Sequence, residues 1–151
     1  RENTPLIRTA REVNDGKVGY TVSRADALIA ALPDAPVACL GLAFKANIDD
    51  FRESPALHVA EELAARHGSR IRIVEPYART LPETLAKAGA TLIDIDTALE
   101  TCPILIVLVD HDVFKSVPLA ERADKRVYDT RGIWPDQPAG DDGAVPLRIA
   151  P

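Results

Sequence analysis

The sequence predicts an α/β fold, a doubly wound parallel sheet of about five strands preceded by a helical lead-in. From Val37 onward, short apolar segments of strand character alternate with segments of helical periodicity. One of them, "PILIVLV" at residues 103–109, is an unbroken apolar run, which is typical of a strand buried on both faces. Strands that alternate with helices are joined by right-handed crossovers in a parallel sheet. We expect the strand order 3-2-1-4-5.

The lead-in, residues 1–34, is expected to contain two helices. Pro5 suits the first position of the first helix, and Gly16 is expected to end it. Ser23 is expected to cap the second helix, which stops before Pro33. The apolar residues at helical spacing are Leu6, Ile7, Ala10 and Val13 in the first helix and Ala25, Leu28, Ile29 and Leu32 in the second. These apolar faces need a partner that covers them.

The remaining elements follow in alternation. The expected strands are 37–42, 71–74, 91–93, 103–109 and 126–129. The expected helices are 55–66, 80–88, 97–101 and 117–123. Ser54 followed by Pro55 is a typical helix start, so the first of these helices is expected to begin there. The turn-rich segment 135–143 is expected to be a surface loop.

The composition is that of a globular protein. The chain has 151 residues, of which 46% are hydrophobic and 27% charged, and this length can bury a real core. A net charge of −5 argues against a general binder of nucleic acids or membrane surfaces, so any anion site must be local. No signal peptide or bilayer-spanning apolar run is found in the sequence. Cys39 and Cys102 lie beside apolar runs, and we expect buried, reduced thiols in a cytoplasmic protein.

One connection carries the features of an anion site. In doubly wound sheets, ligands bind beyond the carboxyl ends of the strands, where the strand order reverses. The segment "GLAFKANIDDFRESP", residues 41–55, follows the first strand and contains Lys45, Arg52 and a helix start. The free N–H groups and dipole of a helix start favour an anion. Arg131 follows the last strand, and if the strand order is 3-2-1-4-5 it is close enough to reach the same crevice.

Two or three charge-assisted contacts, each contributing about 1.5–3 kcal/mol, could hold a diphosphate at this crevice. The alternative is that Lys45 and Arg52 only pair with the acidic residues of their own segment, because exposed ion pairs are common and weak. Those acidic residues are Asp49, Asp50 and Glu53.

The sequence contains no recognisable catalytic or metal-binding set. His58 is expected to be exposed and His67 lies in the last turn of its helix, while a structural hydrogen bond is the expected role of His111, the one near the crevice. The histidines lack metal-ligand spacing and the cysteines form no CxxC. There is no GxSxG, no P-loop and no GxGxxG, since "GLAFKAN" does not fit that pattern.

Four motifs resemble those of the UDP-glucose/GDP-mannose dehydrogenase family. "GLAFKANIDDFRESPA", residues 41–56, resembles the highly specific signature that opens the C-terminal, Rossmann-like domain of that family. "VEPY", "LVDHDVFK" and "YDTRGIW" resemble its later landmarks, in the same order. "NIDDFRESPA" and "DHDVFK" are most similar to the UDP-N-acetyl-D-mannosamine dehydrogenase branch. "NTPLIRTAREVND" is similar to the end of that branch's central helical domain.

The resemblance implies a division of the chain and an activity for its parent protein. Residues 1–34 would be the end of a central dimerisation domain, and residues 35–151 the C-terminal UDP-sugar-binding domain. The parent would be an NAD-dependent dehydrogenase, a homodimer or larger, that oxidises the C6 hydroxyl of UDP-N-acetyl-D-mannosamine to a carboxylate in two steps. Another UDP-hexose, such as UDP-glucose, is the alternative substrate.

The resemblance also implies roles for four residues. Phe44, Lys45 and Arg131 would contact the nucleotide sugar. Arg52 would reach NAD, which is bound mainly by a separate N-terminal domain. The catalytic cysteine and its partners would precede Arg1, so no catalytic residue is expected within this chain.

The chain begins at Arg1 and contains no Met, which also indicates a piece of a longer protein. We expect it to bind at most part of the substrate and to turn over nothing. Two alternatives remain open. The chain could be a free-standing Rossmann-like module that binds nucleotides for regulation or assembly, or a structural unit in which the cations at the crevice only form ion pairs.

Overall fold

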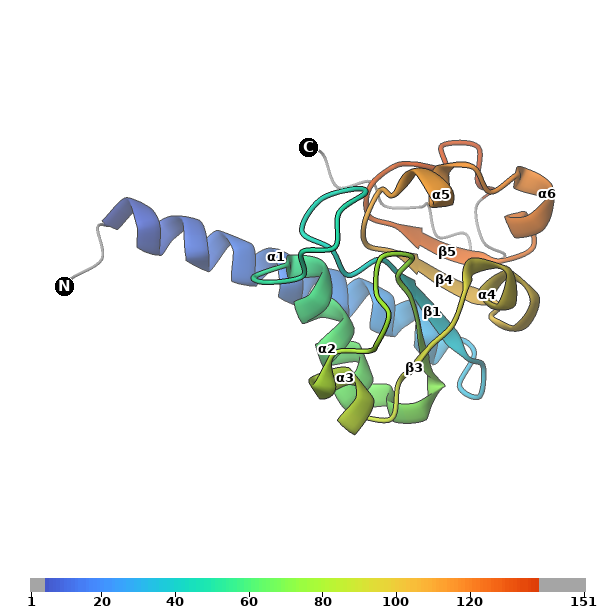
Figure 1. The fold of residues 1–151 in the computed structure, drawn as a ribbon, viewed down its shortest axis with the longest axis horizontal. Helices are drawn as coiled ribbons and strands as arrows, with labels where there is room; N and C mark the ends of the chain where they lie inside the picture. Colours follow the sequence, from blue (N-terminus) through green and yellow to red (C-terminus); the bar gives the residue numbers. More distant parts are fainter. Residues whose placement is uncertain (1–4, 139–151) are drawn as a thin grey trace.

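The structure is a computed structural model that describes the backbone of residues 5–138 and the side chains of residues 16–138. It is a five-stranded sheet with helices on both faces (Figure 1). The strands are β1 (Val37–Leu40), β2 (Ile71–Val74), β3 (Thr91–Leu92), β4 (Ile104–Val107) and β5 (Arg126–Asp129). The helices are α1 (Pro5–Ala30), α2 (Pro55–His67), the 3-10 turn η1 (Gly68–Arg70), α3 (Glu83–Lys87), α4 (Ile95–Thr101), α5 (Asp112–Lys115) and α6 (Leu119–Arg122).

The sheet has the order β3-β2-β1-β4-β5, and every neighbouring pair is parallel, as the sequence predicts. β1 and β4 are buried at every position, which explains why their sequences are apolar without alternation. In their pairing Leu40 lies opposite Val107, so the two strands end side by side. The chain leaves these ends in different directions, and this is the point where the strand order reverses.

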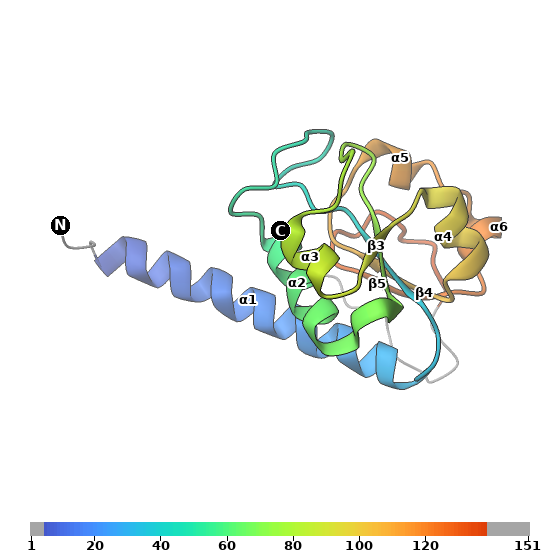
Figure 2. The ribbon, with the colours of Figure 1, turned by 60° about the horizontal axis from the view of Figure 1, so that its bottom comes forward.

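Two apolar layers cover the two faces of the sheet (Figures 1 and 2). On one face, alternate strand residues such as Val37 and Cys39 pack with α1, α2 and α3. On the other face, Ala38 and Leu40 pack with α4, α5 and Trp134. Because successive strand residues point to opposite faces, a four-residue strand serves both layers.

The lead-in is one helix, and the prediction of two was wrong. α1 runs without a break through Gly16, Gly19 and Ser23, so Gly16 ends no helix and Ser23 caps none. A helical glycine costs only about 0.5–1 kcal/mol relative to alanine. The packing of Ala25 and Ile29 in the core outweighs that amount.

The apolar stripe predicted for the second half of the lead-in is confirmed. Ala25 and Ile29 are buried, and Leu28 and Leu32 pack against the same core. The sheet and α2 therefore cover this half of α1. The first stripe, comprising Leu6, Ile7, Ala10 and Val13, lies outside the described side chains.

Several boundaries differ from the prediction. α2 begins at Pro55 as expected, with Ser54 Oγ accepting a hydrogen bond from the Leu57 N–H at 3.4 Å. α3 and α6 are shorter than predicted, and α4 begins earlier because Asp94 caps it. α5 was not predicted, since four residues are too few for a periodic signal. β1 stops two residues before the predicted end, because Gly41 turns away with φ +99°.

The segment after β5 was predicted to be a surface loop, and this was wrong for Gln137. Gln137 is buried and accepts a hydrogen bond from Arg122 Nη1 at 3.0 Å. Arg122 is buried as well, with its guanidinium 4.9 Å from the centre of the Trp134 ring. This cation–π contact and hydrogen bond hold the segment against α6. Residues 139–143 of the predicted loop lie outside the described range.

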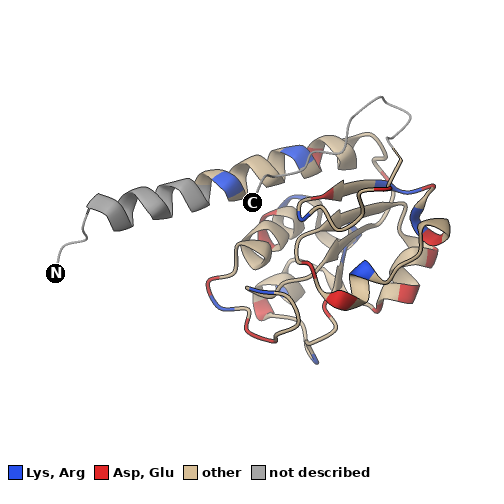
Figure 3. Cartoon of the chain, turned by 90° about the horizontal axis from the view of Figure 1, so that it is seen from above, with Lys and Arg blue, Asp and Glu red and all other residues tan. Residues whose placement is uncertain are grey.

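Basic and acidic residues are interspersed along the described part of the chain (Figure 3). Among the described helices, none has the length and apolar character needed to cross a bilayer.

Gly41→Ala is expected to lower the free energy of unfolding by about 2–5 kcal/mol, since it combines an unfavourable φ with overpacking. A Cβ at Gly41 would lie 2.5 Å from Cβ of Val109, and φ there is +99°. Urea denaturation followed by circular dichroism measures the change. Gly16→Ala is the matched control: nothing lies within 4 Å of its added Cβ, so this helical substitution should stabilise the chain by about 0.5–1 kcal/mol. Equal stability of the two variants would contradict the packing described at Gly41.

Candidate functional site

A small pocket of about 120 Å³ opens beyond the carboxyl ends of β1 and β4. Its walls come from the segments after β1, β4 and β5 and from the start of α2. The lining residues are Ala43, Phe44, Ser54, Pro55, Ala56, Leu108, Val109, Asp110 and Arg131. This is the crevice that the predicted strand order places at the switch point.

The structure brings two of the four predicted site residues into this pocket. Phe44 lines it and is 53% exposed, although an aromatic residue that follows a strand is usually buried. Arg131 lines it from the far side, with Nη2 3.5 Å from Oδ1 of Asp110. Lys45, the next residue after Phe44, is exposed beside the lining and has no ion-pair partner among the described residues.

Arg52 is not among the residues that line the pocket, and its contacts lie within its own segment. Its side chain is 88% exposed, and its Nε lies 3.1 Å from Oδ1 of Asp50. The same hydrogen bond lowers the pKa of the Asp50 carboxyl. Arg52 therefore pairs with an acidic residue of its own segment, as the alternative interpretation of the sequence predicts. Lys45 forms no such ion pair among the described residues.

The turn that carries Arg131 is organised by Asp129. This carboxylate is buried at the end of β5 and accepts hydrogen bonds from the N–H groups of Arg131, Gly132 and Trp134, at 3.1, 2.8 and 2.8 Å. Gly132 has φ +70°, a conformation that glycine adopts without strain. Asp129 therefore fixes the backbone from which Arg131 reaches the pocket.

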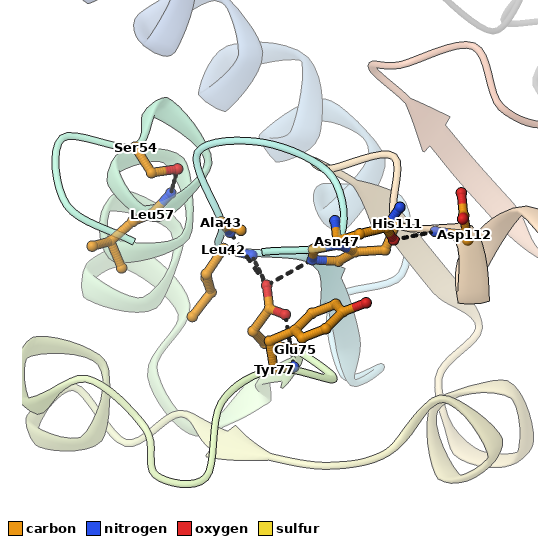
Figure 4. Close-up of polar contacts among 9 residues, drawn as sticks. All are labelled: Leu42, Ala43, Asn47, Ser54, Leu57, Glu75, Tyr77, His111 and Asp112. Carbon is orange, nitrogen blue, oxygen red and sulfur yellow. Dashed lines mark hydrogen bonds and ion pairs between the residues drawn. The ribbon is translucent and has the colours of Figure 1, made fainter. Parts of the chain in front are cut away.

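A second buried carboxylate, Glu75, organises the turn after β1 (Figure 4). Its Oε1 accepts hydrogen bonds from the N–H groups of Leu42 and Ala43, at 2.7 and 3.2 Å. The same oxygen lies 3.0 Å from Nε2 of His111, and Oε2 accepts from the Tyr77 N–H at 3.1 Å. Glu75 is only 3% exposed, so the hydrogen bonds replace water around its charge.

The contacts of His111 define its tautomer. Nδ1 lies 2.8 Å from the backbone nitrogen of Asn47, and that N–H can only donate, so Nδ1 is the acceptor. Nε2 then carries the proton and donates it to Glu75. The ring is fully buried and neutral, which confirms the expected structural hydrogen bond. Glu75 directly follows the strand predicted at 71–74, but the sequence gives no sign of this partnership across 36 residues.

Burial alone would raise the pKa of the Glu75 carboxyl. The hydrogen bond from His111 and those from the N–H groups of Leu42 and Tyr77 oppose it and leave the pKa below its ordinary value. Glu75 is therefore a carboxylate in the folded chain, a buried acceptor for four donors.

The other histidines and the cysteines lie outside the site. His58 is exposed as expected, and His67, in the last turn of α2, has Nε2 2.7 Å from Oδ1 of Asp26. Cys39 and Cys102 are free and buried as predicted, and burial raises the pKa of the Cys39 thiol to about 12. Neither thiol lines the pocket, and the described residues contain no cluster of three or more metal-ligating side chains.

Comparison with known proteins gives consistent matches. The family model "UDP-glucose/GDP-mannose dehydrogenase family, UDP binding domain" matches residues 38–136. UDP-N-acetyl-D-mannosamine dehydrogenase of Salmonella typhi is 44% identical over 137 residues, which cover 85% of this chain and 32% of that protein. NDP-N-acetyl-D-galactosaminuronic acid dehydrogenase of Ralstonia solanacearum is 39% identical over 133 residues, 88% of this chain and 31% of that protein. The chain thus spans about a third of the length of these relatives.

Solved structures agree with the sequence matches. The UDP-D-ManNAc dehydrogenase from Pyrococcus horikoshii superposes with a TM-score of 0.66 at 27% identity, over 88% of this chain and 31% of that one. The UDP-N-acetyl-mannosamine dehydrogenase from S. aureus gives a TM-score of 0.64 at 25% identity, over 85% of this chain and 29% of that one.

Glu75→Gln is expected to lower the free energy of unfolding by about 1.5–3 kcal/mol at neutral pH, since it removes a buried charged acceptor. Because the folded pKa of Glu75 lies below its ordinary value of 4.5, the contribution of the carboxylate is complete above that pH. It is lost as the pH falls through the lower, folded value. The difference between the variant and the unsubstituted chain should therefore shrink in acid, as measured by urea denaturation at a series of pH values.

Glu83→Gln provides the control for this pH series. Glu83 is exposed and pairs with Lys87 at 3.0 Å, so its substitution should change stability little at any pH. If the loss in free energy of unfolding caused by Glu75→Gln stays constant down to low pH, the charge of Glu75 is not what stabilises the turn.

Proposed function

This chain belongs to the UDP-glucose/GDP-mannose dehydrogenase family, and we propose that it binds the nucleotide part of a UDP-sugar in the pocket beyond β1 and β4. The observation that carries the proposal is the composition of that pocket. Phe44, Arg131 and the start of α2 meet there, at the switch point of the sheet, within the range that matches the UDP binding domain. An aromatic ring, a guanidinium and a helix N-terminus suit a base and its diphosphate.

In this proposal each residue has a distinct task. Phe44 offers an exposed ring face to the uridine, since bases stack on aromatic rings. Lys45 and Arg131 contact the diphosphate from the two sides of the crevice. The N-terminus of α2 adds its dipole and the N–H of Ala56, because Pro55 has none to offer.

We further propose that the parent protein is an NAD-dependent UDP-N-acetyl-D-mannosamine 6-dehydrogenase. It would oxidise the C6 hydroxyl to a carboxylate in two steps, forming UDP-N-acetyl-D-mannosaminuronate. Relatives named UDP-N-acetyl-D-mannosamine dehydrogenase support the proposal. The relative from Ralstonia solanacearum carries the name of a different sugar at 39% identity, so UDP-glucose or another UDP-hexose stays an alternative substrate.

NAD would accept the hydride in each of the two oxidation steps. Within this chain, Arg52 is the residue we assign to it. Its guanidinium is almost fully exposed, and its pair with Asp50 is weak enough to be exchanged for a phosphate. The sequence has no Gly-rich dinucleotide loop, so the main part of such a site must come from another domain.

The chain would contribute to two domains of the parent protein. Residues 1–34 would be the end of its central dimerisation domain, residues 35–151 its UDP-sugar-binding domain, and the parent a homodimer or larger. A cytoplasmic location is supported by the two free, buried thiols. The catalytic cysteine would lie outside this chain, because both of its own thiols are buried away from the pocket.

UDP should perturb the amide resonances of residues 42–55, 110–112 and 129–133 in the isotopically labelled chain, and GDP should bind more weakly. Lys45→Ala should weaken UDP binding about tenfold or more, since it removes a charge-assisted contact. Lys87→Ala, which removes an exposed lysine of α3 outside the pocket lining, is the matched control. If Lys45→Ala and Lys87→Ala bind UDP with equal affinity, Lys45 does not contact the ligand.

The chain should form no NADH from UDP-N-acetyl-D-mannosamine and NAD, because it lacks the catalytic cysteine and the dinucleotide loop. An absorbance assay at 340 nm measures this, with a full-length relative as the positive control. Sustained NADH formation by the purified chain would refute the proposal that the catalytic cysteine and the dinucleotide loop lie outside it.

A further inference from the structure

The segment before Phe44 is held by one buried oxygen. Leu42 and Ala43 follow the end of β1, are buried, and both donate their N–H groups to Oε1 of Glu75. Glu75 in turn follows the end of β2, the neighbouring strand. The backbone is therefore fixed up to the residue before Phe44 (Figure 4).

The segment after Lys45 is held by the ring that binds the same carboxylate. The Asn47 N–H donates to Nδ1 of His111, whose Nε2 lies 3.0 Å from Oε1 of Glu75. Asn47 has φ 63°, and its Oδ1 accepts from the Asp112 N–H at 2.9 Å. The adjacent residues His111 and Asp112, which are far from Asn47 in sequence, thus hold this side of the turn (Figure 4).

Between these two attachments lie Phe44, Lys45 and Ala46. The side chains of Phe44 and Lys45 are exposed, so packing against the core does not fix them. The Phe44 N–H donates to the Asp50 carbonyl at 2.9 Å, a contact within the same connection. The position of both side chains relative to the pocket therefore depends on the backbone that Glu75 and His111 hold.

We propose that Glu75 and His111 are positioning residues for the ligand, acting through the backbone of residues 42–47 to hold Phe44 and Lys45 in the geometry that binds UDP. The inference rests on the proposed function. It adds two residues that touch no ligand: neither of them lines the pocket.

The role needs a neutral imidazole in one tautomer. One ring nitrogen must accept from the Asn47 N–H, and the other must donate to Glu75. A neutral histidine presents an acceptor and a donor on separate nitrogens of one rigid ring. Tyr77 and Phe114 flank the ring, with centroids 5.1 and 5.3 Å from it, and hold its orientation.

The test compares His111→Ala with His111→Asn in UDP titrations of the labelled chain. His111→Ala removes both hydrogen bonds. If the binding geometry of the turn then falls to about a tenth of the population, the apparent Kd for UDP rises about tenfold. His111→Asn keeps an acceptor near the Asn47 N–H and loses the donor to Glu75, so its Kd should lie between those of His111→Ala and the unsubstituted chain.

Two measurements without ligand accompany the titration. Amide hydrogen exchange at Leu42, Ala43 and Asn47 should accelerate in His111→Ala, and exchange at Asn47 should remain slower in His111→Asn. The ring ¹⁵N shifts of the unsubstituted chain should show a proton on Nε2 and none on Nδ1. A ring protonated on Nδ1 would overturn the proposal.

Leu85→Ala is the control for stability. Leu85 is fully buried in α3, away from the pocket lining, and its truncation should lower the free energy of unfolding without changing the Kd of the folded chain. If both His111 variants bind UDP as tightly as the unsubstituted chain, Glu75 and His111 have only a structural role and the positioning proposal is overturned. If the unsubstituted chain itself does not bind UDP, the proposed function is overturned. This result distinguishes a failure of the proposed function from a failure of the positioning proposal.

Discussion

The residues that follow the central strand β1 are still buried, so their backbone N–H groups need acceptors within the protein. Gly41 donates to the Val74 carbonyl, the last acceptor that the neighbouring strand offers. Leu42 and Ala43 lie beyond that ladder and turn to the Glu75 carboxylate. A buried donor without a partner costs about 1–3 kcal/mol, so the course of this connection depends on that one side chain. The position of the pocket wall follows from it.

The strand order decides which other segments complete the pocket. Because β4 lies beside β1 rather than after it in the chain, the segments that follow these two strands diverge and leave a gap between them. β5 is next to β4, which brings Arg131 to the same edge. Asp129 resembles Glu75 in being a buried acidic residue at a strand end that accepts from backbone N–H groups. Asp129 accepts from the turn that follows its own strand, whereas Glu75 accepts from the turn after β1 and from Tyr77.

The sheet and its order could be predicted because buried parallel strands are apolar throughout and alternate with helices. Local signals also predicted the start of α2 and the burial of both thiols. Local signals failed at Gly16, where tertiary packing overrides the tendency of glycine to end a helix. They also failed at α5, which is too short to show the helical period of apolar residues. The crevice was predictable from strand ends alone. The Glu75–His111 pair was not, since it joins residues 36 apart whose meeting depends on the completed fold.

Arg131 is not alone in its pocket, because Asp110 lines the same space and lies 3.5 Å from it. The chain thus provides its own counter-ion for this guanidinium. A simple anion that contacts Arg131 would also lie beside the Asp110 carboxylate, which reduces its electrostatic gain. A ligand that offers hydroxyl or N–H donors as well as anionic oxygens can satisfy both partners at once. In the proposed site, this pairing would therefore favour molecules in which negative charge and hydrogen-bond donors are covalently joined over bare inorganic anions.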